Sequence, residues 1–504
     1  MEEHVGKLKK ALRKDTKQRF REKTREGAER LKQSIKDNEL DNQDFTIGME
    51  LETYVINQEG DIATLKNSFF KQTPAKPELG LQNIEINAEP QKLSPKGVKK
   101  QKQELKEKKS KIQQKLQENN RKLLLDSTWT QHPQPEEYLT KHSEKEGFVF
   151  PENMRSVTRY HGIDNAVLER LNGEIKFSTA EVSYKFPSIL FECLATSMQP
   201  HLQIPDTEQF PSYYNYAIRT MAPLLALTSN SPFMPPELYE NPSEETVENS
   251  YHELRIPLFE QAVNTSEEYS RKICRVPDDL ENLEDAVDGI QKDETYHPWL
   301  REWSDPKNGF KDSFWELEYK RGTFWRWVRP VFGGEEVEDA CGEKSVRIEY
   351  RPIPTQPTLK DNISVQLLVN GLLIGLKQKQ HPLKQQSWEK AKQSFYNVVK
   401  NGLNAEIHWV NRDGEKTTEK EEIYTEIFEL AEKGLKTQGF TEKQIQRRLQ
   451  PLKKRWKQRK TPSAWKKQRV KDEIGKGKSF TDAVKQMQQD YYRLSQNAES
   501  FIES

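Results

Sequence analysis

The chain has 504 residues, enough for one large domain with appendages or for two to three ordinary domains. Its 80 Lys and Arg residues and 79 Asp and Glu residues give a formal net charge of +1, so no overall field favours nucleic acid or membrane as a partner. The mean hydropathy of −0.97 is typical of long exposed helices, while aromatic residues at 10% still supply a core. No window approaches the roughly 18 apolar residues of a membrane span, and the N-terminus lacks the apolar segment of a signal peptide. The three cysteines show no paired spacing, so we expect a cytoplasmic protein with reduced thiols.

The two ends of the chain are dense in charge. Sparse apolar residues such as Leu12 and Phe20 predict one or two solvated helices in a charged N-terminal extension over 1–39. We predict a catalytic domain of sheet and helices over 40–410, followed by a basic helical region over 411–504 that packs on it.

The elements between the ends alternate irregularly. Period-two patterns predict strands at 45–57, 81–89, 174–186, around His201, at 344–354 and at 406–411. Helical patterns predict helices at 94–125, 209–227 and 358–376, and over most of the chain from 385 onward, with irregular segments at 126–165 and an acidic, loop-rich insert at 243–313. Strands and helices in blocks, without regular alternation, favour an α+β fold with a mainly antiparallel sheet.

Two glutamates share one face of the first predicted strand. Side chains two residues apart point the same way in a strand, so Glu50 and Glu52 lie on one face and Met49, Leu51 and Val55 on the other. For any single strand, a solvated face of an amphipathic sheet is the favoured explanation.

The same division of faces recurs in three further strands, at Glu85, at His201 with Gln203, and at Glu349 between Arg347 and Arg351. Clustered carboxylates repel one another, and hard oxygen ligands favour Mg²⁺ or Mn²⁺. Arg351, two residues after Glu349, would lie beside such a metal and could hold a phosphate through two hydrogen bonds. The pattern therefore indicates phosphoryl transfer.

Several motifs resemble the glutamate–cysteine ligase family, in its carboxylate–amine ligase branch. They are, in chain order, "GMELETYVIN" (a G-x-E-x-E strand), "ELGLQNIEINAEP", "QPHLQIPD", "APLLALTSNSPF", "VRIEYRPIPTQPTLKD", "ELAEKGLKTQGF" and "TPSAWKK". Each motif alone is weak, but they follow the family's order from about residue 45 to 467, which makes the set specific.

The resemblance implies a fold like that of glutamine synthetase, in which a curved, mainly antiparallel sheet forms a funnel closed by helices. It also implies ATP-dependent formation of an amide or γ-glutamyl bond between a carboxylate and an amine such as that of cysteine, through an acyl phosphate, with release of ADP and phosphate. Mg²⁺ or Mn²⁺ would assist. The amine and the oligomeric state are left open.

The family's site residues carry over to matching positions of this chain. The implied metal ligands are Glu50, Glu52, Glu78, Glu85, His201 and Glu349. Glu50 and Arg351 would be catalytic, and Arg351 and Arg347 would contact the nucleotide. The candidates for substrate binding are Arg155, Arg159, Tyr160, Gln203 and Arg329. Arg155 and Arg159 could equally be surface arginines without a ligand. Glu78 needs a bulge or a turn at Pro77 to reach the same face as Glu85.

Two motifs depart from the family pattern and bear on substrate identity. The family's G-T-H-P-like element appears as "TQHP" at 130–133, and its T-G-A-x-W element appears as "TPSAW" at 461–465. The alternative function is a non-catalytic protein on the same scaffold that binds nucleic acid through the basic segment 444–471. We favour a solvated helical face whose tryptophans, Trp456 and Trp465, pack inward.

Overall fold

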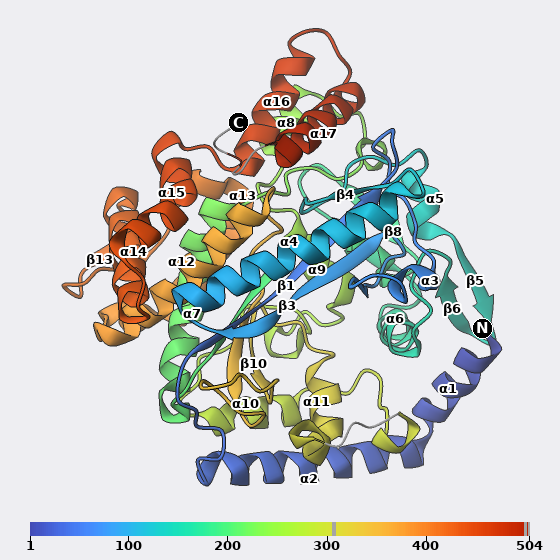
Figure 1. The fold of residues 1–504 in the computed structure, drawn as a ribbon. Helices are drawn as coiled ribbons and strands as arrows, with labels where there is room; N and C mark the ends of the chain where they lie inside the picture. The colour runs from blue at the N-terminus through green and yellow to red at the C-terminus, as the bar shows by residue number, and fades with distance from the viewer. Residues whose placement is uncertain (305–308, 498–500, 502–504) are drawn as a thin grey trace.

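The computed structural model describes residues 1–304, 309–497 and 501, and its centre is a curved antiparallel sheet (Figure 1). Seven strands form it: β1 (Thr46–Ile56), β2 (Lys76–Pro77), β3 (Asn83–Lys92), β4 (Lys122–Leu124), β9 (Met198–Gln203), β10 (Val328–Phe332) and β11 (Val346–Tyr350). Their order is β10-β11-β9-β1-β3-β2, and β4 pairs with β1 beside that path. Helices surround this half-barrel, which confirms the predicted fold class.

The register of the strands brings the predicted polar residues into rows. Glu52 of β1 lies opposite Glu85 of β3. On the other side of β1, Gly48 lies opposite His201 of β9, which in turn lies opposite Glu349 of β11. Because neighbouring side chains across a ladder share a face, these residues line the concave side together.

The opposite face of the sheet is apolar. Met49, Leu51, Ile86, Leu202 and Ile348 are at most 1% exposed. Three helices with contacts to the sheet cover this side: α4 (Pro95–Gln117), α7 (Phe210–Thr228) and α12 (Leu359–Gln378). The core thus fixes which face of each strand carries the polar residues.

Helix α4 begins as predicted but ends earlier. The Ser94 side chain accepts a hydrogen bond from the Gly97 N–H, and Pro95 occupies the first turn. The predicted helix over 94–125 is wrong beyond Gln117, because 122–124 pairs with β1 as β4. Pairing across the sheet outweighs the local helical preference of the Lys/Leu-rich segment.

The N-terminal extension forms two helices, α1 (Glu2–Leu12) and α2 (Lys14–Lys36), as expected. Figure 1 shows α2 running along the bottom of the molecule, beneath α10 (Leu283–Lys292) and α11 (Trp315–Arg321). At Gly27 the helix comes so near the 3₁₀ helix η6 (Phe310–Phe314) that a Cβ there would lie 3.1 Å from the Phe314 Cα. The helix is therefore closely packed against this segment.

The remaining elements decorate the sheet. Small hairpins are formed by β5 (His142–Lys145) with β6 (Phe148–Pro151), β7 (Ile175–Ser178) with β8 (Ser183–Phe186), and β12 (Trp409–Val410) with β13 (Lys416–Thr417). The other α-helices are α3 (Asn67–Phe70), α5 (Pro135–Thr140), α6 (Thr158–Arg170), α8 (Glu244–Asn249), α9 (Arg255–Val263), α13 (Trp388–Asn401), α14 (Lys420–Thr437), α15 (Glu442–Gln458), α16 (Pro462–Ile474) and α17 (Phe480–Asn497). The expected single strand over 174–186 is thus a hairpin, and the segments expected to be irregular or loop-rich contain helices. In the described parts of the chain, no helix has the length and apolar character to cross a membrane.

Candidate functional site

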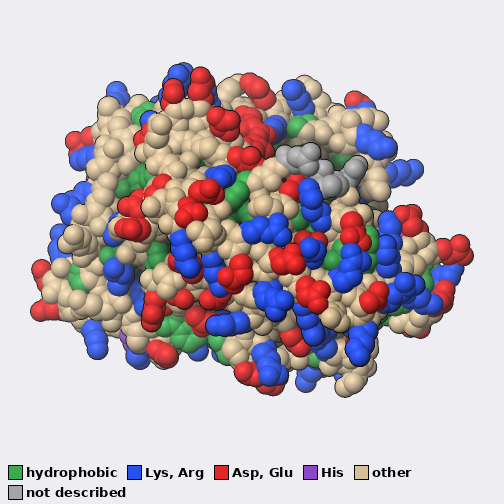
Figure 2. All heavy atoms as spheres, turned by 90° about the horizontal axis from the view of Figure 1, so that it is seen from below, with side chains coloured by type: hydrophobic (Ala, Val, Ile, Leu, Met, Phe, Trp, Pro, Cys, Tyr) green, Lys and Arg blue, Asp and Glu red, His purple; other side chains and the backbone are tan. Residues whose placement is uncertain are grey.

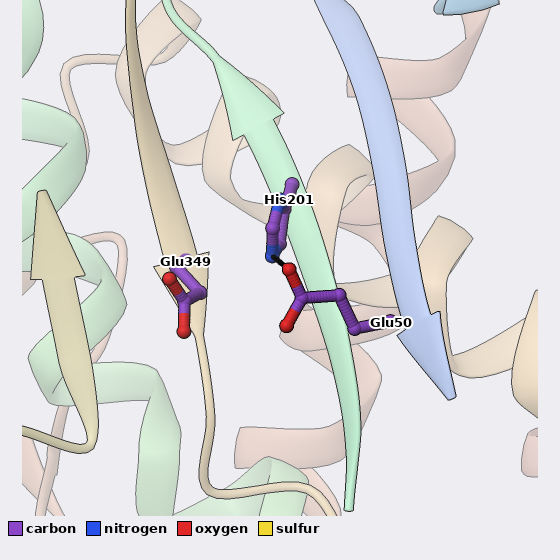
Figure 3. Close-up of side chains that lie close together, drawn as sticks. All are labelled: Glu50, His201 and Glu349. Atoms are coloured by element: carbon purple, nitrogen blue, oxygen red, sulfur yellow. Dashed lines mark ion pairs between the residues drawn. The ribbon is translucent and has the colours of Figure 1, made fainter. Parts of the chain in front are cut away.

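Three side chains from adjacent strands meet on the concave face (Figure 3). Glu50 of β1, His201 of β9 and Glu349 of β11 each offer one ligand atom within 4.8 Å of the others. The Nε2 atom of His201 lies 3.7 Å from Oε1 of Glu50 and is buried without a hydrogen-bond partner among the residues that the structure describes. Two carboxylates and an imidazole at this separation are suited to bind a divalent cation.

Glu349 is held by two arginines. Nε of Arg329 donates to Oε2 at 2.9 Å, Nη2 of Arg329 lies 2.9 Å from Oε1, and Nη1 of Arg351 donates to Oε1 at 2.6 Å. Burial alone would raise the pKa of Glu349, but Arg329 and Arg351 outweigh it and hold this pKa well below the usual value. Glu349 therefore stays ionised and fixes both guanidinium groups.

His201 is oriented by Arg347. Nε of Arg347 donates to Nδ1 of His201 at 3.1 Å, so the neutral ring carries its proton on Nε2, toward Glu50. Burial lowers the pKa of His201 to about 4, with Glu50 opposing and Arg347 reinforcing the effect. For His201 to bind a metal through Nε2, Arg347 must release Nδ1, because a neutral imidazole has only one free lone pair.

Glu52 is saturated with donors. Its Oε2 accepts from the backbone N–H of Ser197 at 2.7 Å and from the Ser197 hydroxyl at 3.0 Å, and its Oε1 accepts from Nε2 of Gln199 at 2.8 Å. Burial raises the pKa of Glu52, while Arg351 opposes that rise. These contacts hold the carboxylate in place beside Glu50.

A second acidic group lies toward β2 and β3. Pairing places Lys76 of β2 opposite Glu85 of β3, so Glu78, two residues after Lys76, lies on the same face as Glu85. The two carboxyl groups share a hydrogen bond: burial and Glu85 raise the pKa of Glu78 well above its usual value, and burial with Glu50 and Glu52 raises that of Glu85 to about 7. Such mutual repulsion suits a bound cation that would replace the shared proton.

Glu192 belongs with these acids and was not expected from the sequence. It lies on the 3₁₀ helix η1 (Ile189–Leu194), and burial followed by Glu52 raises its pKa to about 8. Glu192 also acts electrostatically on Glu78 and Tyr160. Its position in an apolar segment without alternation gave no signal for the site.

A cavity of about 740 Å³ opens over Glu50, His201 and Arg347. This volume is within the range of small-molecule sites. Its opposite wall includes three residues that sequence reasoning missed: Lys311, Trp315 and Glu318.

The α11 wall carries an ion pair that faces the same centre. Nε and Nη2 of Arg321 donate to the Glu318 carboxylate at 2.7 and 2.5 Å. Burial lowers the pKa of Arg321, but Glu318 outweighs this effect and the net pKa is raised. Glu349 and Glu50 add smaller contributions that also raise it. The Glu–Arg spacing of three in "ELEYKR" was the only sequence signal for this pair.

Arg155, a predicted substrate-binding residue, is occupied by protein groups. Its guanidinium donates to the carbonyl oxygens of Leu65 at 2.9 Å and Leu81 at 3.0 Å. Arg159 donates to the Gly322 carbonyl and stacks 5.2 Å from the ring centroid of Tyr319. These contacts explain the conformation of both arginines without a ligand.

Tyr160 and Gln203 differ in their freedom to bind a ligand. Burial, followed by the charge of Glu78, raises the pKa of Tyr160, so its hydroxyl lies within electrostatic reach of the second acidic group. Gln203 lines the cavity, but its amide accepts from the Thr46 N–H at 3.2 Å and donates to the Ile204 carbonyl at 2.8 Å.

The basic C-terminal segment packs into the fold. Trp456 is 7% exposed, and its ring centroid lies 4.0 Å from that of Tyr424. Lys466 of α16 is buried and pairs with Asp126. Thus Trp456 faces inward, as we expected.

The family model for glutamate-cysteine ligase family 2 matches residues 46–493. No curated protein matches the sequence. A glutamate–cysteine ligase from Francisella tularensis, in complex with AMP, superposes with a TM-score of 0.53 at 12% identity, over 91% of this chain and 90% of that one. A bifunctional glutathione synthetase from Pasteurella multocida gives a TM-score of 0.52 at 11% identity, over 90% of this chain and 52% of that one. At these identities the two structures show a shared fold.

Proposed function

Because the chain belongs to glutamate-cysteine ligase family 2, it is an ATP-dependent ligase that forms C–N bonds, and we propose that it joins an amino-acid carboxylate to an amine such as that of cysteine through an acyl phosphate. The observation that carries the proposal is the meeting of Glu50, His201 and Glu349 beside two arginines, with Glu50 and His201 lining the 740 Å³ cavity. The cavity gives room for substrates, and the charges suit a phosphoryl group and its counter-ion.

The proposed reaction has two steps. A carboxylate oxygen of the substrate attacks the γ-phosphorus of ATP, the bond to the bridging oxygen breaks, and ADP leaves with that electron pair. The amine then attacks the acyl carbon, phosphate leaves, and the amine gives up a proton. Because an acyl phosphate hydrolyses readily, the wall formed by η6 and α11 would shelter it from water.

The residues of the chain divide these tasks. Glu349 holds Arg329 and Arg351, and Nε of Arg351 is buried without a partner among the described residues, so it can donate to a phosphoryl oxygen. Arg347 lines the cavity, and its guanidinium would contact the nucleotide once it releases its hydrogen bond to His201.

The candidate metal ligands are Glu50, Glu52, Glu78, Glu85, His201 and Glu349. A divalent cation bound by these residues would neutralise charge on the phosphates. The raised pKa values of Glu78 and Glu85 and the unpartnered Nε2 of His201 fit such an ion. The ion is Mg²⁺ or Mn²⁺ in this proposal, since the donors are mostly hard oxygens.

We assign the amino-acid substrate to the space near Tyr160 and Arg329. The Tyr160 hydroxyl feels the charges of Glu78 and other acids and has no hydrogen-bond partner among the described residues. We therefore rank it above Arg155, Arg159 and Gln203, whose polar atoms already bind protein groups.

The test is release of ADP from ATP with Mg²⁺, glutamate and a panel of amines that includes cysteine. We expect one or more amines to stimulate release, and Glu50→Ala to abolish it. Glu107→Ala, on the exposed side of α4, is the matched control and should keep full activity. The proposal fails if no amine stimulates ADP release, or if Glu50→Ala is as active as the control.

A further inference from the structure

A groove of about 570 Å³ lies between α2 and the ends of α10 and α11, away from the cavity described above. Its basic lining residues are Lys14, Lys17, Arg21 and Arg25 of α2 and Lys320 of α11. Glu22 is the only acid among the residues that line it. Figure 2 views the molecule from below, the side on which α2 lies in Figure 1, and shows lysine and arginine side chains interspersed with acids over this face.

Most cations of α2 outside the groove pair with acids. Arg19 pairs with Glu302 at 2.8 Å, Lys23 with Glu26 at 2.8 Å, Arg30 with Glu26 at 3.4 Å, and Lys32 with Asp288 at 2.5 Å, which leaves Lys36 in the last turn as the exception. Within the described parts of the chain, the side chains of Lys14, Lys17, Arg21 and Arg25 form no hydrogen bond or ion pair. Among the lining residues of the groove, five cations thus face the single carboxylate of Glu22, and positive charge is in excess.

Lys320 distinguishes the groove from a solvated helix face, because it is a buried cation that lines it. It is 5% exposed, and its Nζ donates one hydrogen bond, to the Gln291 carbonyl at 2.8 Å. An ammonium has three protons to donate, so two lack an acceptor in the described structure. Burial lowers the pKa of Lys320 to about 8; Asp293 opposes this change and Arg21 adds to it. A buried cation with unmet donors is costly unless an anion accompanies it.

We propose that this groove is a binding site for a small multivalent anion of the phosphorylated class. Arginine binds phosphate oxygens in pairs, and lysine adds point charge, so Arg21, Arg25 and Lys320 can surround one or two phosphoryl groups. The site is separate from the catalytic cavity but shares α11 with it: Lys320 faces the groove, whereas Glu318 lines the cavity.

Isothermal titration of the full chain with inorganic tripolyphosphate, without divalent cations, tests the proposal. We expect Arg21→Gln/Arg25→Gln and, separately, Lys320→Gln to weaken binding by about tenfold or more, because each removes charge-assisted hydrogen bonds. Lys23→Gln/Arg30→Gln removes the same charge from the same helix outside the groove and should change affinity less than about twofold. Arg21 and Arg25 are exposed, so Arg21→Gln/Arg25→Gln keeps the test valid if Lys320→Gln fails to fold.

Tripolyphosphate can also enter the catalytic cavity, so the number of sites matters. The groove variants should lose one class of binding site, while Arg351→Met, which changes the cluster around Glu349, should keep the groove site. Equal affinities and site numbers in groove and control variants would overturn the proposal. Tighter, groove-dependent binding of an oligothymidylate of matched charge would overturn the choice of a small anion in favour of nucleic acid.

Discussion

Replacing Glu85 by glutamine probes the repulsion among the acids of β1–β3. The folded-state pKa of Glu85 is about 7 against a usual 4.5, because burial, Glu50 and Glu52 disfavour its charge. The folded protein therefore holds this proton longer than the unfolded chain does, so stability is complete below pH 4.5 and falls as the pH rises toward 7. The interval between 4.5 and about 7, at about 1.36 kcal/mol per pH unit, corresponds to about 3 kcal/mol.

Urea denaturation at pH 5 and pH 8, with a chelator or with Mg²⁺, measures this effect. With chelator, the wild type should lose about 2–3 kcal/mol between the two pH values through this group, since a small part of the effect is already lost at pH 5, and Glu85→Gln should lose correspondingly less. Mg²⁺ should restore the wild type at pH 8 more than it restores the variant. Glu89→Gln, on the same strand but 56% exposed, should leave the wild-type pH dependence in place. The same pH dependence in Glu85→Gln and wild type would refute the reasoning.

Three further changes separate stability from activity. Glu349→Ala should lower the free energy of unfolding by about 3–5 kcal/mol, because two buried arginines, Arg329 and Arg351, lose the carboxylate that they share. Glu50→Ala should stop ADP release at little cost in stability. Equal urea midpoints for the two variants would contradict this difference. Lys466→Met should cost about 3–5 kcal/mol, because its buried carboxylate partner loses its counter-ion, and a wild-type melting temperature would show that the pair contributes little. Gly27→Leu should cost about 1–3 kcal/mol through overpacking, whereas Gly6→Leu, which meets nothing within 4 Å, should be nearly neutral by the same thermal melt.

Much of the site could be predicted because strands impose a period of two. Alternation at Glu50 and Glu52 and around Glu349 identified one polar face, and the register then brought those residues together. Glu78 was the exception, because its position near Glu85 depends on the separate strand β2. This strand has only two residues, too few for an alternating pattern to be recognised in the sequence.

The missed residues share a different cause. Lys311 and Glu318 lie on short helical segments within an aromatic stretch, and their position is set by packing against α2, far away in sequence. Arg155 and Gln203 are candidate ligand-binding residues through the family resemblance. Their actual partners are backbone atoms such as the Leu65 carbonyl, and backbone partners leave no trace in side-chain patterns.

The close packing of α2 on η6 gives residues before the family-matched segment a part in supporting the wall of the candidate site. A shortened chain that began at residue 46 would keep every acid of the sheet, yet Phe314 and the first turn of α11 would lose the surface on which they rest. Chain boundaries taken from a family match can thus remove residues that support a cavity wall. An enzyme shortened at such a boundary would keep its acidic residues but lose the packing that holds this wall in place.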